Sequence, residues 1–156
     1  MSYCLNVETP IGPMYFRAND KAVTSLCFGS VPEDRSCALL EEAAKQLREY
    51  FAGERRHFGL PLSPEGTAFQ RKVWRALCDI PCGETRSYGQ IAAAVGSPGA
   101  SRAVGMANNR NPIAIIIPCH RVIGADGSLT GYGGGLDKKE FLLRHERRTC
   151  EKCITE

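Results

Sequence analysis

The feature that most constrains how this chain can fold is a five-residue apolar run at residues 113–117, which ends at Pro118. The run is mostly β-branched and contains no polar side chain, a pattern that predicts fully buried backbone. Proline carries no backbone N–H and therefore stops any β-ladder that the run could enter. We expect the residues after Pro118 to be held by a rigid, buried support.

Three residues capable of chemistry follow Pro118, namely Cys119, His120 and Arg121. Their side chains can supply a nucleophile, a proton acceptor and an electrostatic partner or structural pin. Free cysteine is also among the most buried residue types, so Cys119 can equally be a small core residue. This segment alone leaves both interpretations open, because a cysteine next to a histidine is a candidate site and no more.

The composition is that of a globular protein. The chain has 156 residues, of which 43% are hydrophobic, which suits one ordinary domain or two small ones. No stretch predicts a membrane span, and the amino terminus lacks the charged-then-apolar pattern of a signal peptide, so we expect a cytoplasmic protein without a membrane partner. Eight cysteines scattered through ordinary patterned segments favour reduced thiols over a disulfide framework. They are Cys4, Cys27, Cys37, Cys78, Cys82, Cys119, Cys150 and Cys153.

The charge is unevenly distributed along the chain. Residues 1–65 contain 7 Lys and Arg against 9 Asp and Glu, whereas residues 66–156 contain 13 against 8. The second part is therefore the basic part. This mild excess is compatible with contact to phosphates and equally with an ordinary solvated surface.

The first part of the chain predicts a small α/β domain. Strand-like runs at residues 3–7, 14–17 and 22–28 are separated by turn compositions, which indicates an antiparallel meander. Ser36 can then cap a helix that ends at Gly53. The segment at residues 54–66 has no clear periodicity and predicts a linker. We therefore expect an accessory domain at residues 1–62 and a working domain at residues 63–156.

The second part is punctuated by helix-capping signals. Thr67 with Gln70, and Ser87 with Gln90, are capping boxes that predict two helices. Ser97 followed by Pro98 predicts a third helix through about residue 107, so the second and third helices form a helix-turn-helix candidate. Small residues give the third helix a smooth surface from which one long polar side chain, Arg102, extends. Such a helix could approach another backbone closely, or could simply be packed inside the protein. The small residues are Ala100, Ser101, Ala103, Gly105 and Ala107.

Glycines and a last helix follow the cysteine. Residues 130–135 read Thr-Gly-Tyr-Gly-Gly-Gly, and Asp137 with Glu140 is expected to cap a helix that carries Glu146 near its end. Glu146 has one interpretation as a surface charge and another as the carboxylate that orients His120. The Cys150 and Cys153 pair has half the spacing of a zinc site, and we predict no metal there because no matching second pair is evident.

The motif Pro118-Cys119-His120-Arg121-Val122, preceded by Asn111-Pro112 and followed by Tyr132 and Gly134-Gly135-Leu136, resembles the active-site signature of O6-alkylguanine-DNA alkyltransferases, also called methylated-DNA-protein-cysteine methyltransferases. The similarity extends from about residue 67 to residue 146, and includes the segments 87–89, 101–105 and 142–146. It implies an α+β protein with a small RNase H-like N-terminal α/β domain and a mainly helical, winged-helix-like C-terminal domain with a helix-turn-helix. The first domain matches only in its length and in its order of strands and helix.

The resemblance implies DNA repair by direct damage reversal. An alkyl group on O6-alkylguanine or O4-alkylthymine in double-stranded DNA would move irreversibly to Cys119, so each chain would act once, as a monomer and without a cofactor. His120, oriented by Glu146, would remove the thiol proton through a water molecule. Asn111 would hold the tight turn, and Tyr88 would donate a hydrogen bond to the leaving base. The expected place of action is the cytoplasm, or the nucleus in a eukaryote.

The resemblance also assigns the substrate contacts. The damaged base would leave the stack, Arg102 would fill the vacated place, and the small residues of its helix would approach the minor groove. Those residues are Ala100, Ser101, Ala103 and Gly105. The base and its alkyl group would be bound by Val122, Tyr132, Gly133, Ala114 and Lys139. Ala114 and Gly133 replace the proline and serine of some relatives, which leaves the accepted range of alkyl groups open.

Three other functions use part of the same pattern. A cysteine hydrolase would also use a cysteine, a histidine and a carboxylate, but it leaves the helix-turn-helix unexplained. A DNA-binding regulator would use the helix pair without chemistry. An alkyltransferase-like protein binds lesions without repairing them and lacks the cysteine, so the presence of Cys119 argues against it.

Overall fold

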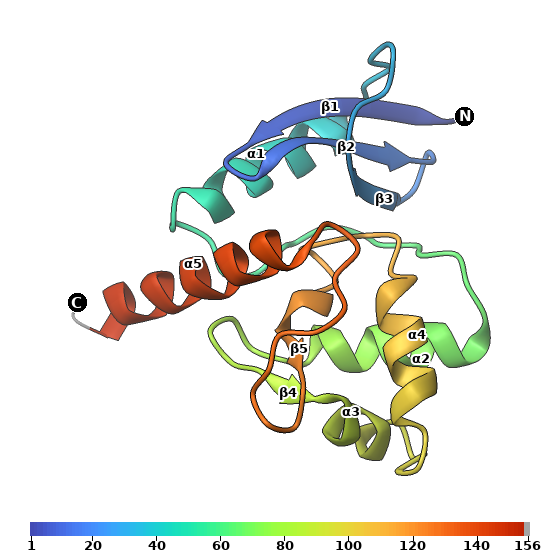
Figure 1. Ribbon diagram of the computed structural model, residues 1–156. Helices are drawn as coiled ribbons and strands as arrows, with labels where there is room; N and C mark the ends of the chain where they lie inside the picture. Colours follow the sequence, from blue (N-terminus) through green and yellow to red (C-terminus); the bar gives the residue numbers. More distant parts are fainter. Residues whose placement is uncertain (155–156) are drawn as a thin grey trace. The chain divides into compact units, whose positions relative to one another are not determined.

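The computed structural model describes residues 1–154, with side chains through Glu151, and the chain divides into two compact units (Figure 1). Unit 1 contains Met1–Glu65 together with Pro112–Ala114, and unit 2 contains Gly66–Asn111 and Ile115–Glu156. The side chain of Cys153 lies outside the described residues. The predicted domain boundary at residue 62 stays a prediction.

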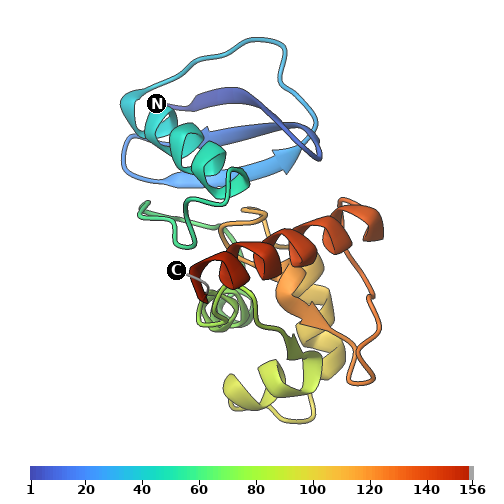
Figure 2. The same ribbon diagram turned by 90° about the vertical axis from the view of Figure 1, so that its left-hand side faces the viewer.

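Unit 1 is a three-stranded antiparallel sheet with one helix packed on it. The strands are β1 (Tyr3–Thr9), β2 (Gly12–Ala18) and β3 (Val23–Phe28), and their order in the sheet follows the sequence, as predicted. The helix α1 (Ala38–Phe51) covers one face of this sheet (Figure 2). Alternate residues of β2 point into the core because side chains alternate between the two faces of a strand. The fully buried side chains of this core include Met14, Phe16, Leu26, Leu40 and Leu47.

The predicted cap of α1 is wrong by one residue. The N-cap is Cys37, whose side chain makes no capping hydrogen bond. The Ser36 hydroxyl instead donates to the Glu41 carboxylate over 2.8 Å. A hydroxyl that is bonded to a side chain in this way does not satisfy the free N–H groups of the first helical turn.

Pro112–Ala114 cluster with unit 1 because their backbone pairs with the edge strand β3. The Leu26 N–H donates to the Pro112 carbonyl over 2.9 Å, and the Ala114 N–H donates to the Leu26 carbonyl over 3.0 Å. The apolar run therefore makes a single bridge rather than a strand. Its isoleucines are buried as predicted, but Ile115 has a φ of +69°, which a β-branched residue rarely adopts.

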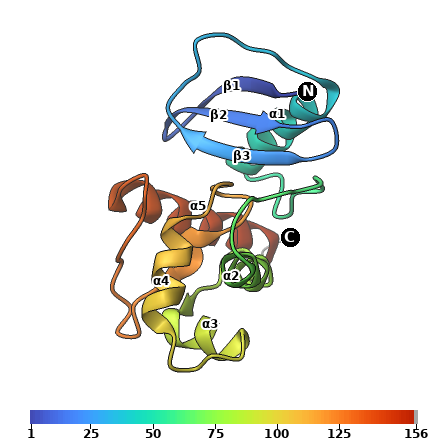
Figure 3. The ribbon, with the colours of Figure 1, turned by 90° about the vertical axis from the view of Figure 1, so that its right-hand side faces the viewer.

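Unit 2 is mainly helical. Its helices are α2 (Ala68–Cys78), α3 (Tyr88–Ala94), α4 (Ser101–Asn109) and α5 (Leu136–Ile154). A short parallel pair, β4 (Arg86–Ser87) and β5 (Val122–Ile123), and the 3₁₀ helix η1 (Cys119–Arg121) complete it. The helices α2, α3 and α4 pack against one another (Figure 3). Within the described residues, no helix combines the length and the apolar character that crossing a membrane requires.

The capping signals of unit 2 predict the start of two helices correctly and the start of two others wrongly. Both predicted capping boxes are present, at Thr67 and at Ser87. The helix α4 begins at Ser101 and not at Ser97, because residues 97–100 form a turn closed by the Ala100 N–H and the Ser97 carbonyl. The helix α5 begins before Asp137 and continues to Ile154, so Glu146 lies in its middle rather than near its end.

Candidate active site

Cys119 is the first residue of η1, and its side chain is 6% exposed. The segment that leads to it is held by Asn111, whose side-chain N–H donates to the Ile117 carbonyl over 2.7 Å. This bond spans the turn that contains Ile115. Asn111 therefore lies where it can hold the turn, as the resemblance implies.

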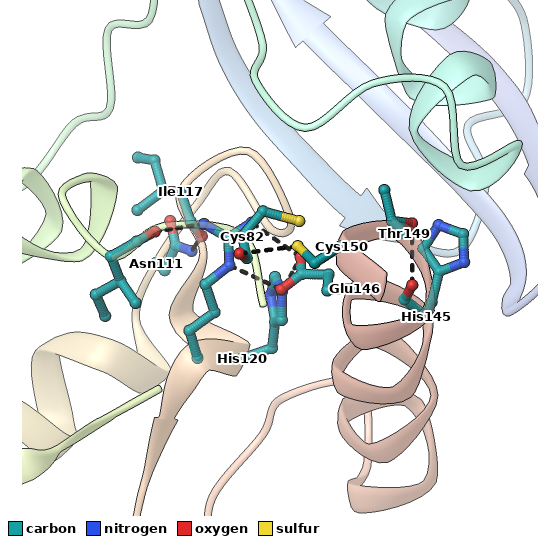
Figure 4. A network of polar contacts seen from close by, with 10 residues as sticks. Cys82, Asn111, Ile117, His120, His145, Glu146, Thr149 and Cys150 are labelled. Atoms are coloured by element: carbon teal, nitrogen blue, oxygen red, sulfur yellow. Dashed lines mark hydrogen bonds and ion pairs between the residues drawn. The ribbon is translucent and has the colours of Figure 1, made fainter. Parts of the chain in front are cut away.

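His120, Arg121 and Glu146 form a buried polar network. His120 Nε2 lies 2.7 Å from Glu146 Oε2, and the two side chains are 0% and 1% exposed. Arg121 donates to both carboxylate oxygens, over 2.8 Å and 2.9 Å, and to the Ile80 carbonyl over 2.6 Å. Figure 4 shows His120, from η1, and Glu146, from α5, facing each other. The network fixes the imidazole ring of the residue that directly follows the nucleophile candidate.

The charge of the network determines which imidazole nitrogen can accept a proton. Burial on its own raises the pKa of Glu146, but the charges and hydrogen bonds of His120 and Arg121 outweigh it and hold that pKa well below its usual range. An ionised carboxylate only accepts hydrogen bonds, so in neutral His120 the proton resides on Nε2. Nδ1 then carries the lone pair. It is buried and has no hydrogen-bond partner within the described residues.

The thiol is a protonated group at rest. Burial raises the pKa of Cys119, while a hydrogen bond with Asn111 and the charge of Lys139 act in the opposite direction. A thiol in this state is a weak nucleophile until a base removes its proton. The only imidazole in the network is that of the adjacent residue, His120.

Lys139 lies inside the protein rather than at an open binding surface. Its side chain is 0% exposed, and Nζ donates to the Val122 carbonyl over 2.6 Å and to the Thr130 carbonyl over 2.7 Å. Burial lowers the pKa of Lys139 to about 8. One lone pair of the Val122 carbonyl is thus occupied by Lys139.

The glycine-rich loop meets Tyr88. The Tyr88 hydroxyl donates to the Thr130 carbonyl over 3.2 Å and accepts from the Thr130 hydroxyl over 3.3 Å. Tyr132 is half-buried, and burial raises the pKa of its phenol. Gly133 is exposed, and a Cβ at this position would meet no atom within 4 Å. Ala114 is half-buried and belongs to unit 1.

The α4 face, defined as the exposed residues Ser101, Arg102, Ala103 and Met106, is less smooth than predicted. Met106 is 66% exposed and projects one turn after Arg102. Ala107 is buried, so it does not belong to this face. Gly105 is half-buried beneath the Tyr88 ring, and Ala100 is the half-buried N-cap.

Comparisons with known proteins match both parts of the chain. Residues 68–148 match the model of the 6-O-methylguanine DNA methyltransferase DNA-binding domain, and residues 2–64 match that of the ribonuclease-like domain of the same enzymes. A methylated-DNA–protein-cysteine methyltransferase of Methanosarcina barkeri is 55% identical over 148 residues, covering 90% of this chain and 94% of the relative. This chain belongs to the 6-O-methylguanine DNA methyltransferase family. The predicted family and fold class are confirmed.

Solved structures of 6-O-methylguanine DNA methyltransferases agree with this assignment. The crystal structure of Mycobacterium tuberculosis O6-methylguanine methyltransferase is 47% identical and covers 96% of this chain and 94% of its own, with a TM-score of 0.87. The crystal structure of M. tuberculosis OGT in complex with DNA covers 94% and 93% at the same identity, with a TM-score of 0.88.

In this member of the 6-O-methylguanine DNA methyltransferase family, the sequence pattern does not indicate two polar residues that lie near the site. Thr130 joins Tyr88 to Lys139 through its carbonyl. Asn108 donates from its side chain to the Cys119 carbonyl over 3.2 Å. Neither contact follows a spacing rule, so no signal in one sequence indicates it. Among the described side chains, no three His, Cys, Asp or Glu residues are grouped so as to hold a metal ion.

Proposed function

We propose that this protein repairs DNA by transferring the alkyl group of O6-alkylguanine to Cys119, as a methylated-DNA–protein-cysteine methyltransferase. The observation that carries this proposal is the buried Cys119 beside His120, whose Nε2 is bonded to Glu146 and whose Nδ1 has no partner among the described residues. A buried polar atom in a native protein is normally satisfied by protein or by ordered water. Nδ1 is therefore suited to accept a proton from the thiol through one water molecule.

Activation of the nucleophile is the first step. The Cys119 proton passes through water to Nδ1, which leaves a thiolate and an imidazolium, and the ionised Glu146 stabilises the positive charge. Arg121 keeps Glu146 ionised by donating to both of its oxygens. A positioned general base of this kind contributes about 10²- to 10⁴-fold to a rate.

Transfer follows by direct displacement at the alkyl carbon. The new bond forms between Cys119 Sγ and that carbon while the bond from the carbon to guanine O6 breaks, and the electron pair moves onto the guanine. The guanine then takes up a proton to become the normal base. The Tyr88 hydroxyl, which donates to the Thr130 carbonyl in this structure, would turn to donate a hydrogen bond to the base as negative charge develops. The product is a thioether, a poor leaving group, so each chain acts once. No cofactor is needed.

DNA contact belongs to α4 in this proposal. The exposed Arg102 enters the duplex and replaces the extruded nucleotide, at a cost of a few kcal/mol for unstacking the damaged base. The exposed small residues Ser101 and Ala103 let α4 approach the minor groove, with Gly105 and Ala100 beside them. Val122, Tyr132, Gly133 and Lys139 form or support the base pocket. O4-alkylthymine fits the same chemistry. We propose a monomer that acts in the cytoplasm.

The test is to map the transferred group. An oligonucleotide with an isotope-labelled O6-methylguanine is mixed with the protein, which is then digested and sequenced by mass spectrometry. We expect all label on the peptide that carries Cys119, and none after the change Cys119→Ala. Label on the peptide of Cys78, Cys82 or Cys150, or full transfer by Cys119→Ala, would contradict the assignment.

A further inference from the structure

Asn108 links the helix assigned to DNA contact to the nucleophile. It lies on the buried side of α4 and is 2% exposed. Its side-chain Nδ2 donates to the Cys119 carbonyl over 3.2 Å. That carbonyl belongs to the peptide unit joining Cys119 to His120. A hydrogen bond to this carbonyl therefore fixes the orientation of the peptide plane that joins Cys119 to His120.

The orientation of the Asn108 carboxamide follows from its partner. A carbonyl oxygen can only accept a hydrogen bond, so the amide nitrogen, and not Oδ1, must face Cys119. Oδ1 is then directed elsewhere. It is buried and has no hydrogen-bond partner among the described residues, a property that it shares with His120 Nδ1. Each of the two side chains keeps one polar atom unpaired beside the same peptide unit.

The backbone around Asn108 is itself well held. The Trp74 indole N–H donates to the Ala107 carbonyl over 2.8 Å in the core of unit 2. Asn111 binds the Ile117 carbonyl, so two asparagines near the end of α4 hold the carbonyls of residues 117 and 119, on either side of Pro118. The nucleophile segment has no β-ladder to hold it. These two side-chain bonds supply the missing support.

We propose that Asn108 is a positioning residue for alkyl transfer. Its Nδ2 sets the relative orientation of Cys119 and His120, and its Oδ1 is an acceptor for the water that carries the thiol proton. This inference rests on the proposed function, because it presumes transfer to Cys119 with His120 as the base. Catalytic groups held by a neighbouring shell of hydrogen bonds lose rate when that shell loosens, although the shell never touches the substrate.

The experiment uses Asn108→Leu, which keeps a similar volume and removes both polar atoms. The matched control is Gln46→Leu, since Gln46 is another buried carboxamide, 4% exposed, that bonds to the backbone of Gly59 in unit 1. For each folded protein we would measure the dissociation constant for methylated duplex, the first-order transfer rate at saturating duplex, the rate with free O6-benzylguanine and the melting temperature. Asn108→Ala is the second variant in case Asn108→Leu does not fold.

We expect Asn108→Leu to lower the transfer rate about tenfold or more on both substrates, with duplex affinity changed less than about twofold. Gln46→Leu should lower the melting temperature and leave both rates unchanged. Wild-type rates in a folded Asn108 variant would overturn the inference, as would a loss confined to duplex affinity. Transfer that persists in Cys119→Ala, or is unaffected in His120→Ala, would instead overturn the proposed function.

Discussion

The buried network around Cys119 and the exposed α4 face differ in almost every physical respect. In the network, His120, Arg121 and Glu146 are buried, and the Glu146 carboxylate binds the other two side chains over 2.7–2.9 Å. On the α4 face, Arg102 and Met106 are exposed to solvent. Under the proposed function, chemistry and duplex contact are therefore carried by separable parts of unit 2. Substitutions in the network should change both rate and stability, and those on the face should change only the reaction with DNA.

The largest effect is expected from Glu146→Ala. Removing the carboxylate leaves the buried charge of Arg121 without its ion-pair partner, and breaking a buried pair costs about 3 to 5 kcal/mol of unfolding free energy. It also removes the group that fixes the tautomer of His120, so transfer should slow by about 10²-fold or more. Denaturant unfolding and single-turnover kinetics on the folded fraction measure the two losses. Normal stability with normal transfer would show that the network is not the site.

Arg102→Ala should affect duplex DNA alone. If Arg102 offsets the few kcal/mol needed to extrude the base, its loss should slow repair of duplex about ten- to a hundredfold. Reaction with free O6-benzylguanine needs no extrusion and should be unchanged. Arg71→Ala, at an exposed arginine of α2, is the control for the loss of one positive charge. Equal losses of rate on both substrates would show that Arg102 affects the chemical step and would contradict its separate role in duplex contact.

Alkylation of Cys119 should itself lower the stability of the folded protein. A methyl group added to the 6% exposed Cys119 must fit a packed site, and overpacking costs about 1 to 3 kcal/mol. We expect a lower melting temperature after reaction with methylated DNA, and no change for Cys119→Ala treated in the same way. An unchanged or higher melting temperature would contradict the predicted overpacking. It would not contradict alkyl transfer to Cys119.

The smallest effect is a change in how stability depends on pH. The folded-state pKa of Glu146 lies below its unfolded value of about 4.3, so the unfolded state binds more protons in between. The stabilisation is present above about pH 4.3 and is lost as the pH falls toward the folded-state pKa. Glu146→Gln should lose less stability than the wild type between about pH 5 and 3. Parallel stability curves in this window would contradict the ionised pairing.

The helix caps of unit 2 show what a single sequence can and cannot predict. The caps at Thr67 and Ser87 were predictable because both partners of each capping box lie within four residues. The start of α4 was not, because Ala100 offers no side-chain cap and residues 97–100 close a turn instead.

Contacts between residues far apart in the sequence are also hard to predict from one sequence. The pairing of His120 with Glu146 was expected from the resemblance to a known family, and spacing alone left Glu146 as a possible surface charge. The positive φ of Ile115 contradicts the preference of a β-branched residue and is imposed by the turn that Asn111 holds. The bond from Asn108 to Cys119 crosses that turn and belongs to no local motif.

The central claim is that each chain accepts one alkyl group, on Cys119, and never releases it. The most direct measurement is a titration of the protein with excess O6-methylguanine duplex, in which repaired guanine and the intact protein mass are followed in the same samples. We expect repair to stop at one equivalent, with every chain heavier by one methyl group in place of one hydrogen. Repair beyond one equivalent, or repaired base without a heavier protein, would contradict the account.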